Sequence, residues 1–497
     1  MMENYTKFAV RGAVTILIIS LIAALLGYVV RVLLARNLSV EEFGLFYAVF
    51  AFVGIFGIFK SLGFDRALAK FIPEFVHKKK SDMIKNCIMY SAFIQLFTNS
   101  VVIIVLYVLS DFLAANYFKY DEAGIILKVL AIAFFIDSFV QTLKFAFQGF
   151  KKPVYFSGID VIRGLLLITI ILIGLKLNYG VLSPAYAYVI ASAVITVLFS
   201  IIMVKKVFPD FLRSKFSFDK KLIKSLSKYG IHIMAITVGV SILGSTDIVM
   251  LTYFTDLKAV ALYSVALPTA RALRNFILPI AAVLLPLTSE LWAKNSKKII
   301  VAGMESLYKY SIIIIVPLAL VMLSFTDLLI QVLYGKDYLA AGTSMKILAI
   351  GMIFGVLSSI DANFFAGIGK PQIYAKIIYF GAFLNVILNL ILIPVIGIMG
   401  AAIATAFSYF VIMAMTFKDV RKYIKLSFPI GIWARTILAG AIFTLLIWAL
   451  KKILFLNVWV ETAVVLVLSG IIYIAMLFLF RIIDIREVKD LYRRIVK

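Results

Sequence analysis

Long apolar segments recur along the whole chain, and each is about as long as a bilayer is thick. A helix needs about 20 mostly apolar residues to cross the hydrocarbon core, and segments of that kind alternate here with short charged or turn-rich breaks. The pattern predicts an all-α polytopic membrane protein. About fourteen transmembrane helices are expected, over residues 12–35, 43–62, 87–109, 123–147, 155–175, 181–204, 229–254, 259–285, 306–326, 343–366, 373–393, 397–417, 433–450 and 459–480.

The composition supports lipid as the surrounding medium. The chain has 497 residues, of which 63% are hydrophobic and 15% are charged, and its mean hydropathy is +1.07. Soluble domains average about 45–50% apolar and about 25% charged residues. The first apolar segment is too long for the apolar region of a cleavable signal peptide, so we expect it to remain a helix.

Positive charge is distributed in a pattern that indicates topology. Lys and Arg outnumber Asp and Glu by 50 to 25, and most of them fall in alternate loops. The positive-inside rule assigns those loops to the cytoplasm, which predicts a multi-pass protein of the cell membrane with both termini cytoplasmic. Basic stretches such as 205–228 then interact with membrane lipids, and the distribution argues against nucleic-acid binding.

One basic stretch predicts an amphipathic helix. Over residues 65–85, Phe71, Ile72 and Phe75 fall on one helical face, whereas lysines such as Lys70 fall on another. We expect this helix to lie along the cytoplasmic surface of the membrane.

The two halves of the chain resemble each other. Residues 145–153 (FAFQGFKKP) match residues 363–371 (NFFAGIGKP), and each segment follows one long apolar stretch and precedes another. Because the offset covers six predicted helices, an even number, the halves should have the same orientation, related by an axis along the membrane normal. The prediction is two parallel-repeat six-helix bundles plus two C-terminal helices without a counterpart. The expected domains are the first bundle (1–204), a basic cytoplasmic linker (205–228), the second bundle (229–417), and helices 13 and 14 with a basic cytoplasmic tail (418–497).

Four short segments carry a family resemblance: 34–44 (LARNLSVEEFG), 62–68 (LGFDRAL), 286–291 (PLTSEL) and 367–371 (GIGKP). With them, the chain resembles the multidrug/oligosaccharidyl-lipid/polysaccharide (MOP) exporter superfamily, in its polysaccharide-biosynthesis branch of lipid-linked oligosaccharide flippases. The resemblance covers nearly the whole chain, including the six-plus-six-plus-two layout.

The resemblance implies a flippase working by alternating access. Its substrate would be a glycan on a polyprenyl phosphate or diphosphate, moved from the cytoplasmic to the outer leaflet, and the glycosyltransferases of the same pathway would be its partners. Two other functions stay open, a cation-coupled multidrug or organic-cation exporter and a membrane glycan polymerase. A cation exporter should present more carboxylates than arginines to its cavity, and a polymerase should have a large outer loop with catalytic residues.

The chain offers little material for catalytic or metal chemistry. It has one cysteine, Cys87, and two histidines, which excludes an intrachain disulfide and a multi-cysteine metal site. We expect a transporter rather than an enzyme, with no cofactor and no metal apart from a coupling ion, H⁺ or Na⁺.

Arginines deep within predicted helices are candidates to bind the substrate's phosphate. Arg271 lies near the predicted midplane, and Arg274 lies three residues later on the same helical face. Arg163 lies within the fifth predicted helix, where Asp160 is close enough in sequence to neutralise it instead. A cation at the bilayer centre costs at least ~2.5–3.5 kcal/mol, and a guanidinium can bind two phosphate oxygens at once. The alternative for each arginine is packing against acids or carbonyl groups of neighbouring helices.

Two charged residues occupy equivalent positions in the repeats. Arg31 in the first predicted helix and Asp247 in the seventh would form an outer gate if they faced each other. Both lie near helix ends, so each could also extend to the membrane surface by itself. The same explanation is expected for Lys60, at the end of the second predicted helix.

A polar stripe in the fourth predicted helix is a candidate for ion coupling. Asp137, Gln141 and Lys144 follow one another along one helical face. Asp137 is either an H⁺ or Na⁺ site or a buried partner for Arg163 or Lys144. Asp160, in the fifth predicted helix, is a second acidic candidate for ion coupling.

Overall fold

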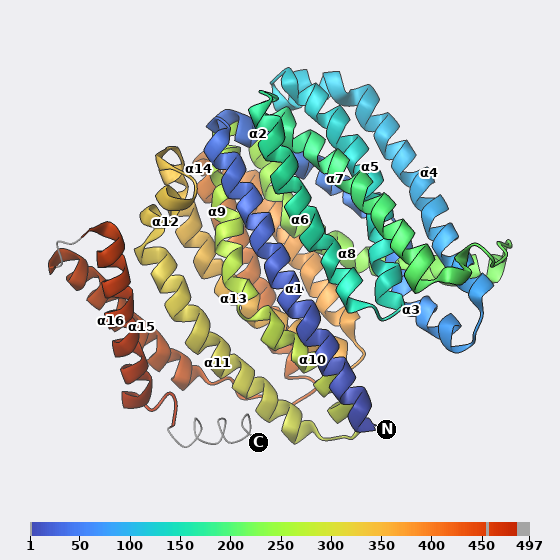
Figure 1. The fold of residues 1–497 in the computed structure, drawn as a ribbon. Coiled ribbons are helices and arrows are strands. Elements are labelled where there is room, and N and C mark those ends of the chain that lie inside the picture. The colour runs from blue at the N-terminus through green and yellow to red at the C-terminus, as the bar shows by residue number, and fades with distance from the viewer. Residues whose placement is uncertain (1, 454–456, 485–497) are drawn as a thin grey trace. The chain divides into compact units, whose positions relative to one another are not determined.

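The structure is a computed structural model that describes residues 2–453 and 457–484. This part of the chain is almost entirely helical and contains no strand (Figure 1), as the apolar pattern predicts. Its helices are α1 (Met2–Asn37), α2 (Val40–Ile55), η1 (Phe56–Phe59), α3 (Phe64–His77), α4 (Ser81–Leu113), η2 (Ala114–Phe118), α5 (Glu122–Gly149), α6 (Pro153–Lys176), α7 (Leu182–Ile202), η3 (Met203–Val207), η4 (Pro209–Phe211), α8 (Lys220–Phe254), α9 (Leu257–Asn275), α10 (Leu278–Ala293), α11 (Lys297–Ser324), α12 (Thr326–Leu333), η5 (Lys336–Ala341), α13 (Gly342–Gly367), α14 (Pro371–Val420), α15 (Ile430–Ile453) and α16 (Val458–Leu479).

Eleven helices of the described chain are long and apolar enough to cross a membrane. One of them, α14, is two helices joined at a kink, where Ile396 and Gly397 leave helical backbone geometry. The predicted helices 373–393 and 397–417 meet at this kink. The predicted single helix over 259–285 is wrong, because the chain breaks between α9 and α10, and a proline at the start of α10 favours a new helix there. The total of fourteen transmembrane helices stays a prediction.

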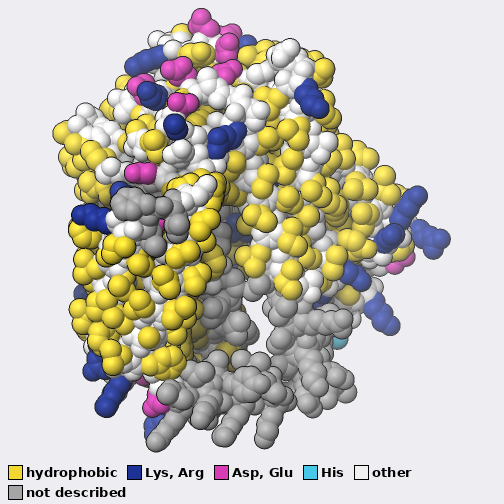
Figure 2. Space-filling model, turned by 60° about the vertical axis from the view of Figure 1, so that its left-hand side comes forward, with side chains coloured by type: hydrophobic (Ala, Val, Ile, Leu, Met, Phe, Trp, Pro, Cys, Tyr) yellow, Lys and Arg dark blue, Asp and Glu magenta, His cyan; other side chains and the backbone are white. Residues whose placement is uncertain are grey.

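Apolar side chains cover much of the face that Figure 2 shows. The exposed side chains include Phe97, Val108, Val395, Leu438 and Leu479, all on long helices. Exposure of so large an apolar surface to water is unfavourable, whereas the hydrocarbon core of a bilayer solvates it. The surface therefore agrees with a multi-pass membrane protein.

The described chain packs as two units. Unit 1 is the chain as far as Ser264, together with Leu333–Tyr338 and Val386–Ala401, and unit 2 is Val265–Val332, Leu339–Asn385 and the chain from Ala402 onward. In unit 1, α5 packs against α2, α3, α4, α6 and α7. Helix α8 packs against α2 and α3, and α1 runs alongside α6 (Figure 1). In unit 2, α11 and α10 pack on α13, and α15 packs between α11 and α16. The domain boundaries expected from the repeat stay a prediction.

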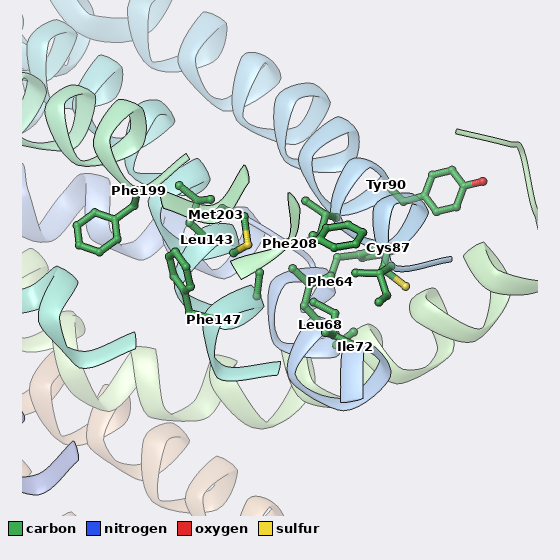
Figure 3. Close-up of a cluster of buried hydrophobic side chains, with 14 of the residues drawn as sticks. Phe64, Leu68, Ile72, Cys87, Tyr90, Leu143, Phe147, Phe199, Met203 and Phe208 are labelled. Carbon is green, nitrogen blue, oxygen red and sulfur yellow. The ribbon is translucent and has the colours of Figure 1, made fainter. Parts of the chain in front are cut away.

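The amphipathic segment is a shorter helix than predicted. α3 ends at His77, and α4 begins at Ser81 after a turn in which Lys79 has a positive φ. Phe64, Leu68 and Ile72 are buried in a cluster with side chains of α4, α5 and α7 (Figure 3), whereas the lysines of the turn are exposed. The predicted extension to residue 85 is therefore wrong, and the predicted division of faces is confirmed for α3. Its place at the cytoplasmic surface stays a prediction.

The sequence repeat has a matching backbone geometry. After α5, the Lys152 amide donates to the Phe147 carbonyl (2.9 Å), and after α13, the Lys370 amide donates to the Phe365 carbonyl (2.8 Å). The residue before each of these lysines has a positive φ, and each next helix starts with proline. A shared turn that ends one helix and starts the next explains why the GKP-type motif recurs.

The repeat also continues into the segments that follow each set of helices. The Ser217 amide donates to the Asn86 side chain on α4, and the Ser427 amide donates to Glu305 on α11, both at 3.1 Å. Both serines lie in a Lys-x-Ser-Phe sequence, beginning at residues 215 and 425. The similarity of 215–218 and 425–428 was missed in the sequence because its spacing differs from that of the other matches.

A glycine in α2 permits close approach of two segments of unit 1. A Cβ atom at Gly44 would lie 2.0 Å from the Leu257 carbonyl oxygen, whereas one at Gly54, in the same helix, would meet nothing within 4 Å. We expect Gly44→Ala to lower the free energy of unfolding by about 1–3 kcal/mol, because overpacking forces the backbone apart. Thermal unfolding in detergent measures this, with Gly54→Ala as the control. Equal melting temperatures for the two variants would contradict the close approach.

Candidate functional site

A cavity lies inside unit 1, among helices α2, α5, α6 and α7. Its volume is about 130 Å³. Its polar lining consists of two basic side chains, one acidic side chain, a tyrosine and a serine, and the remainder is apolar. The lining residues are Phe50, Val53, Gly54, Lys60, Leu130, Ala133, Phe134, Asp137, Arg163, Tyr188 and Ser192.

Three charged side chains form one cluster in this cavity. Asp137 on α5 accepts from Lys60 at one carboxylate oxygen and from Arg163 at the other, and both N–O distances are 2.5 Å. The three side chains are between 14% and 21% exposed. We call Lys60, Asp137 and Arg163 the charge triad. Two cations against one carboxylate leave it with a net positive charge.

The triad confirms one expected pair, Asp137 with Arg163, and corrects two other expectations about pairing. Arg163 pairs with Asp137 rather than with Asp160, because α5 presents Asp137 across the cavity while Asp160 bonds to Lys144 at 2.5 Å. The alternative of Lys144 as the partner of Asp137 is wrong for the same reason. Gln141, at 3.4 Å, is only a distant donor to Asp137.

The Lys60 side chain also extends in a different direction from the predicted one. The chain leaves α2 through the short helix η1, and the Lys60 side chain extends inward to Asp137 instead of outward to the membrane surface. Its ammonium nitrogen lies 4.6 Å from the centre of the Phe134 ring. The expectation of snorkelling is therefore wrong, and Lys60 joins the candidate site.

Aromatic rings complete the cavity wall. Tyr188 on α7 lies 5.1 Å, centre to centre, from Phe50 on α2, and Phe134 lies beside Lys60. Ring faces attract cations and supply flat apolar surface with a polar tip at tyrosine. The cavity therefore combines excess positive charge with aromatic surface.

The predicted arginines of unit 2 lie on α9. Arg271 and Arg274 are both partly buried, three residues apart, and so share one helical face. The Arg274 guanidinium lies 5.8 Å from the Tyr409 ring, with a long contact of 3.4 Å to its hydroxyl group. The Arg274 Nε is buried and has no hydrogen-bond acceptor. Phosphate binding by these arginines stays a prediction.

Arg31 and Asp247 each have clear neighbours in unit 1. Arg31 donates to the Ser264 carbonyl group, and its guanidinium carbon lies 4.1 Å from the Tyr47 ring centre. Asp247 is buried and accepts from the Tyr263 hydroxyl (2.6 Å) and the Asn389 amide (2.7 Å). A role as a gate stays a prediction for both residues.

The sequence analysis missed a buried acid in unit 2. Asp361 on α13 accepts from the Tyr308 hydroxyl, and its other carboxylate oxygen has no hydrogen-bond partner. Phe417, Phe428 and Trp433 surround the Tyr308 ring. Asp361 is the single acid of the predicted helix 343–366, which was a signal in the sequence, but its position near the end of that helix made it look like a residue of the membrane surface.

Known proteins resemble this chain over most of its length. The family described as "Polysaccharide biosynthesis protein" matches residues 9–292. An uncharacterized membrane protein of Methanocaldococcus jannaschii is 36% identical, over 99% of this chain and 100% of its own. The probable low-salt glycan biosynthesis flippase Agl15 of Haloferax volcanii is 22% identical, over 97% of this chain and 98% of its own.

Two solved structures have a similar fold. The lipid II flippase MurJ in its inward closed conformation has a TM-score of 0.75 at 16% identity, covering 97% of this chain and 100% of that one. An inward-facing MATE family multidrug resistance transporter of the MOP superfamily has a TM-score of 0.72 at 18% identity, covering 83% of this chain and 98% of that one. At these identities, the similarity shows the fold alone.

Proposed function

Because the chain belongs to the polysaccharide biosynthesis protein family, we propose that it flips a lipid-linked glycan across the cell membrane as a member of the MOP superfamily. The substrate is a glycan on a polyprenyl phosphate or diphosphate, which moves from the cytoplasmic to the outer leaflet by alternating access. The Haloferax relative and MurJ are named as flippases, and the similar MATE protein is named as a transporter, which supports a transporter rather than an enzyme. The Haloferax relative, named as a probable glycan biosynthesis flippase, supports this substrate class.

The charge triad is the observation that carries the proposal. Lys60, Asp137 and Arg163 line a cavity among α2, α5, α6 and α7, of which the last three are long and apolar enough to cross a membrane, and they leave one positive charge in excess. Placing a cation in the apolar part of a membrane is costly, and the cost is offset when an anionic substrate binds beside it. The phosphate of a lipid-linked glycan is such an anion, and the aromatic wall suits its sugar rings.

The sign of the charge separates this proposal from a cation exporter. A site for organic cations needs uncompensated carboxylates, because a cation gains most from an opposite charge in a medium of low dielectric constant. In the cavity of unit 1, the only carboxylate among the lining residues is already shared by two cations. Arg271 and Arg274 add further positive charge in unit 2.

Partners and energetics follow from the same proposal. The substrate would come from glycosyltransferases that assemble it at the cytoplasmic face, where the positive-inside rule predicts the basic loops and both termini. H⁺ or Na⁺ is the coupling ion we expect. Asp137 is less suited to coupling than the sequence suggested, because two cations hold its carboxylate.

Deletion of the gene tests the proposal. A strain without this protein should accumulate a lipid-linked glycan and lose the corresponding surface glycan, because synthesis continues while transfer across the membrane stops. Mass spectrometry of extracted lipids measures the accumulation, and a plasmid copy should reverse it. Unchanged lipid-linked glycans and an unchanged surface would contradict the proposal.

A further inference from the structure

We propose that the cavity of unit 1 binds one monoanionic oxyanion group, held by Lys60 and Arg163 beside Asp137. The inference rests on the proposed function and gives it a defined subsite. The group is either the phosphodiester-type phosphate of the lipid linkage or a carboxylate on a sugar, since both present paired oxygens with a single negative charge.

The charge of the triad sets the charge of the ligand. Lys60 and Arg163 carry two positive charges, and Asp137 carries one negative charge. Asp160, one turn from Arg163 on α6, does not compensate the excess, because it bonds to Lys144. One monoanion makes the cluster neutral, whereas a dianion would leave an uncompensated negative charge in a low-dielectric cavity.

The donors of Arg163 are incompletely used. Its Nη2 donates to Asp137, while its buried Nε has no acceptor. A guanidinium presents its N–H groups as a planar fork that matches two oxygens of one phosphate or carboxylate. The contact with Asp137 at a single nitrogen leaves part of this fork for a second oxyanion.

Lys60 can donate hydrogen bonds to the same ligand from another side. Its ammonium group has three donors, of which Asp137 accepts one, and it lies against the Phe134 ring. Asp137 thus separates two cations that would otherwise repel each other. We assign Asp137 a positioning role, because it holds Lys60 and Arg163 without being the ligand's partner.

The size of the cavity limits the ligand to one group. Its volume of about 130 Å³ is close to that of a cavity of about 150 Å³ that holds one benzene molecule. One phosphate or one sugar carboxylate fits this space, whereas a complete glycan diphosphate does not. The rest of the substrate must therefore lie outside the cavity.

Equilibrium dialysis of the purified full-length protein tests the inference. The probes are radiolabelled diethyl phosphate and glucuronate, which are monoanions, and glucose, which is neutral. We expect one bound molecule of one or both anions per protein, sensitive to ionic strength, and much weaker binding of glucose. Preference for diethyl phosphate would assign the site to the lipid linkage, and preference for glucuronate would assign it to a sugar.

Matched variants locate the binding in the cavity. Arg163→Gln should weaken anion binding at least tenfold, because the remaining Lys60–Asp137 pair is neutral. Asp137→Asn should strengthen it at least tenfold by removing the competing carboxylate. The control, Glu74→Gln, removes an exposed carboxylate of α3 outside the cavity lining and should leave binding unchanged. If Asp137→Asn fails to fold, Arg163→Gln decides the matter.

Three results would overturn the inference: no anion binding by the wild-type protein, binding that survives Arg163→Gln, or equal binding of glucose. Dialysis does not depend on flipping, so the two proposals fail separately. Absence of anion binding with normal complementation of the deletion strain would remove only the subsite. Anion binding without glycan accumulation in that strain would remove the proposed function.

Discussion

Arg271→Ala is expected to abolish glycan flipping while leaving folded protein in the membrane. Arg271 is partly buried in α9, with Arg274 on the same helical face, and its predicted depth leaves its guanidinium near the middle of the bilayer. If Arg271 binds the substrate's phosphate as predicted, loss of the guanidinium removes a contact that would be bidentate. Arg271→Lys should impair flipping less severely, because an ammonium keeps the charge but not the fork. Complementation of the deletion strain and the amount of folded protein are both measured.

The competing explanation for Arg271 is structural, and the same two measurements separate it. If Arg271 only supports packing, Arg271→Ala should lower abundance or melting temperature while transport per molecule stays near the wild-type value. The control is Arg435→Ala, which removes an exposed arginine of α15 that donates to the Phe480 carbonyl group. The control should complement fully. Transport per molecule near wild type in Arg271→Ala would exclude a role of Arg271 in phosphate binding.

Replacing the whole charge triad with apolar residues should separate stability from function. The triple variant Lys60→Met/Asp137→Leu/Arg163→Met is expected to be as stable as the wild-type protein or more stable by up to about 4 kcal/mol, because apolar groups avoid the desolvation of buried ions. Asp137→Leu alone should lose about 3–5 kcal/mol, because it leaves two cations uncompensated. Thermal and denaturant unfolding in detergent measure both variants.

The triple variant should nevertheless fail to complement the deletion strain, because its cavity no longer attracts an anion. The control is Lys128→Met/Asp111→Leu. It removes the ion pair between α5 and α4, whose N–O distance is 2.9 Å and whose residues do not line the cavity. That control should restore the surface glycan. A stable triple variant that complements as well as wild type would show that the triad has no part in transport.

The apolar pattern predicted most of the fold because the bilayer imposes it locally. Each crossing needs its own apolar stretch, and the paired turns at 145–153 and 363–371 repeat because one backbone geometry ends and restarts a helix. The break between α9 and α10 was missed, because the polar end of α9, with Arg271, Arg274 and Asn275, was assigned to the interior of one longer helix. Hydropathy alone does not show where one helix ends and the next begins.

The site was harder to predict because tertiary packing decides its partners. Sequence proximity suggested Asp160 for Arg163, yet packing of α5 on α6 brings Asp137 to that arginine. Lys60 was expected at the membrane surface, because its position near the end of a helix does not reveal that the chain turns inward through η1. The sequence therefore identified the charged residues and offered Asp137 with Arg163 as one of several pairs, but the choice among these pairs required the structure.

Reconstitution tests the central claim most directly. The purified protein is placed in lipid vesicles that carry, in both leaflets, the lipid-linked glycan isolated from the deletion strain. A membrane-impermeant glycosidase added outside first digests the outer glycan, and the remaining glycan is followed over time. We predict that vesicles with wild-type protein lose nearly all of it, while vesicles with the triple variant retain the inner half. Retention of the inner half in wild-type vesicles, under gradients of H⁺ and of Na⁺ in both directions, would contradict the assignment as a flippase.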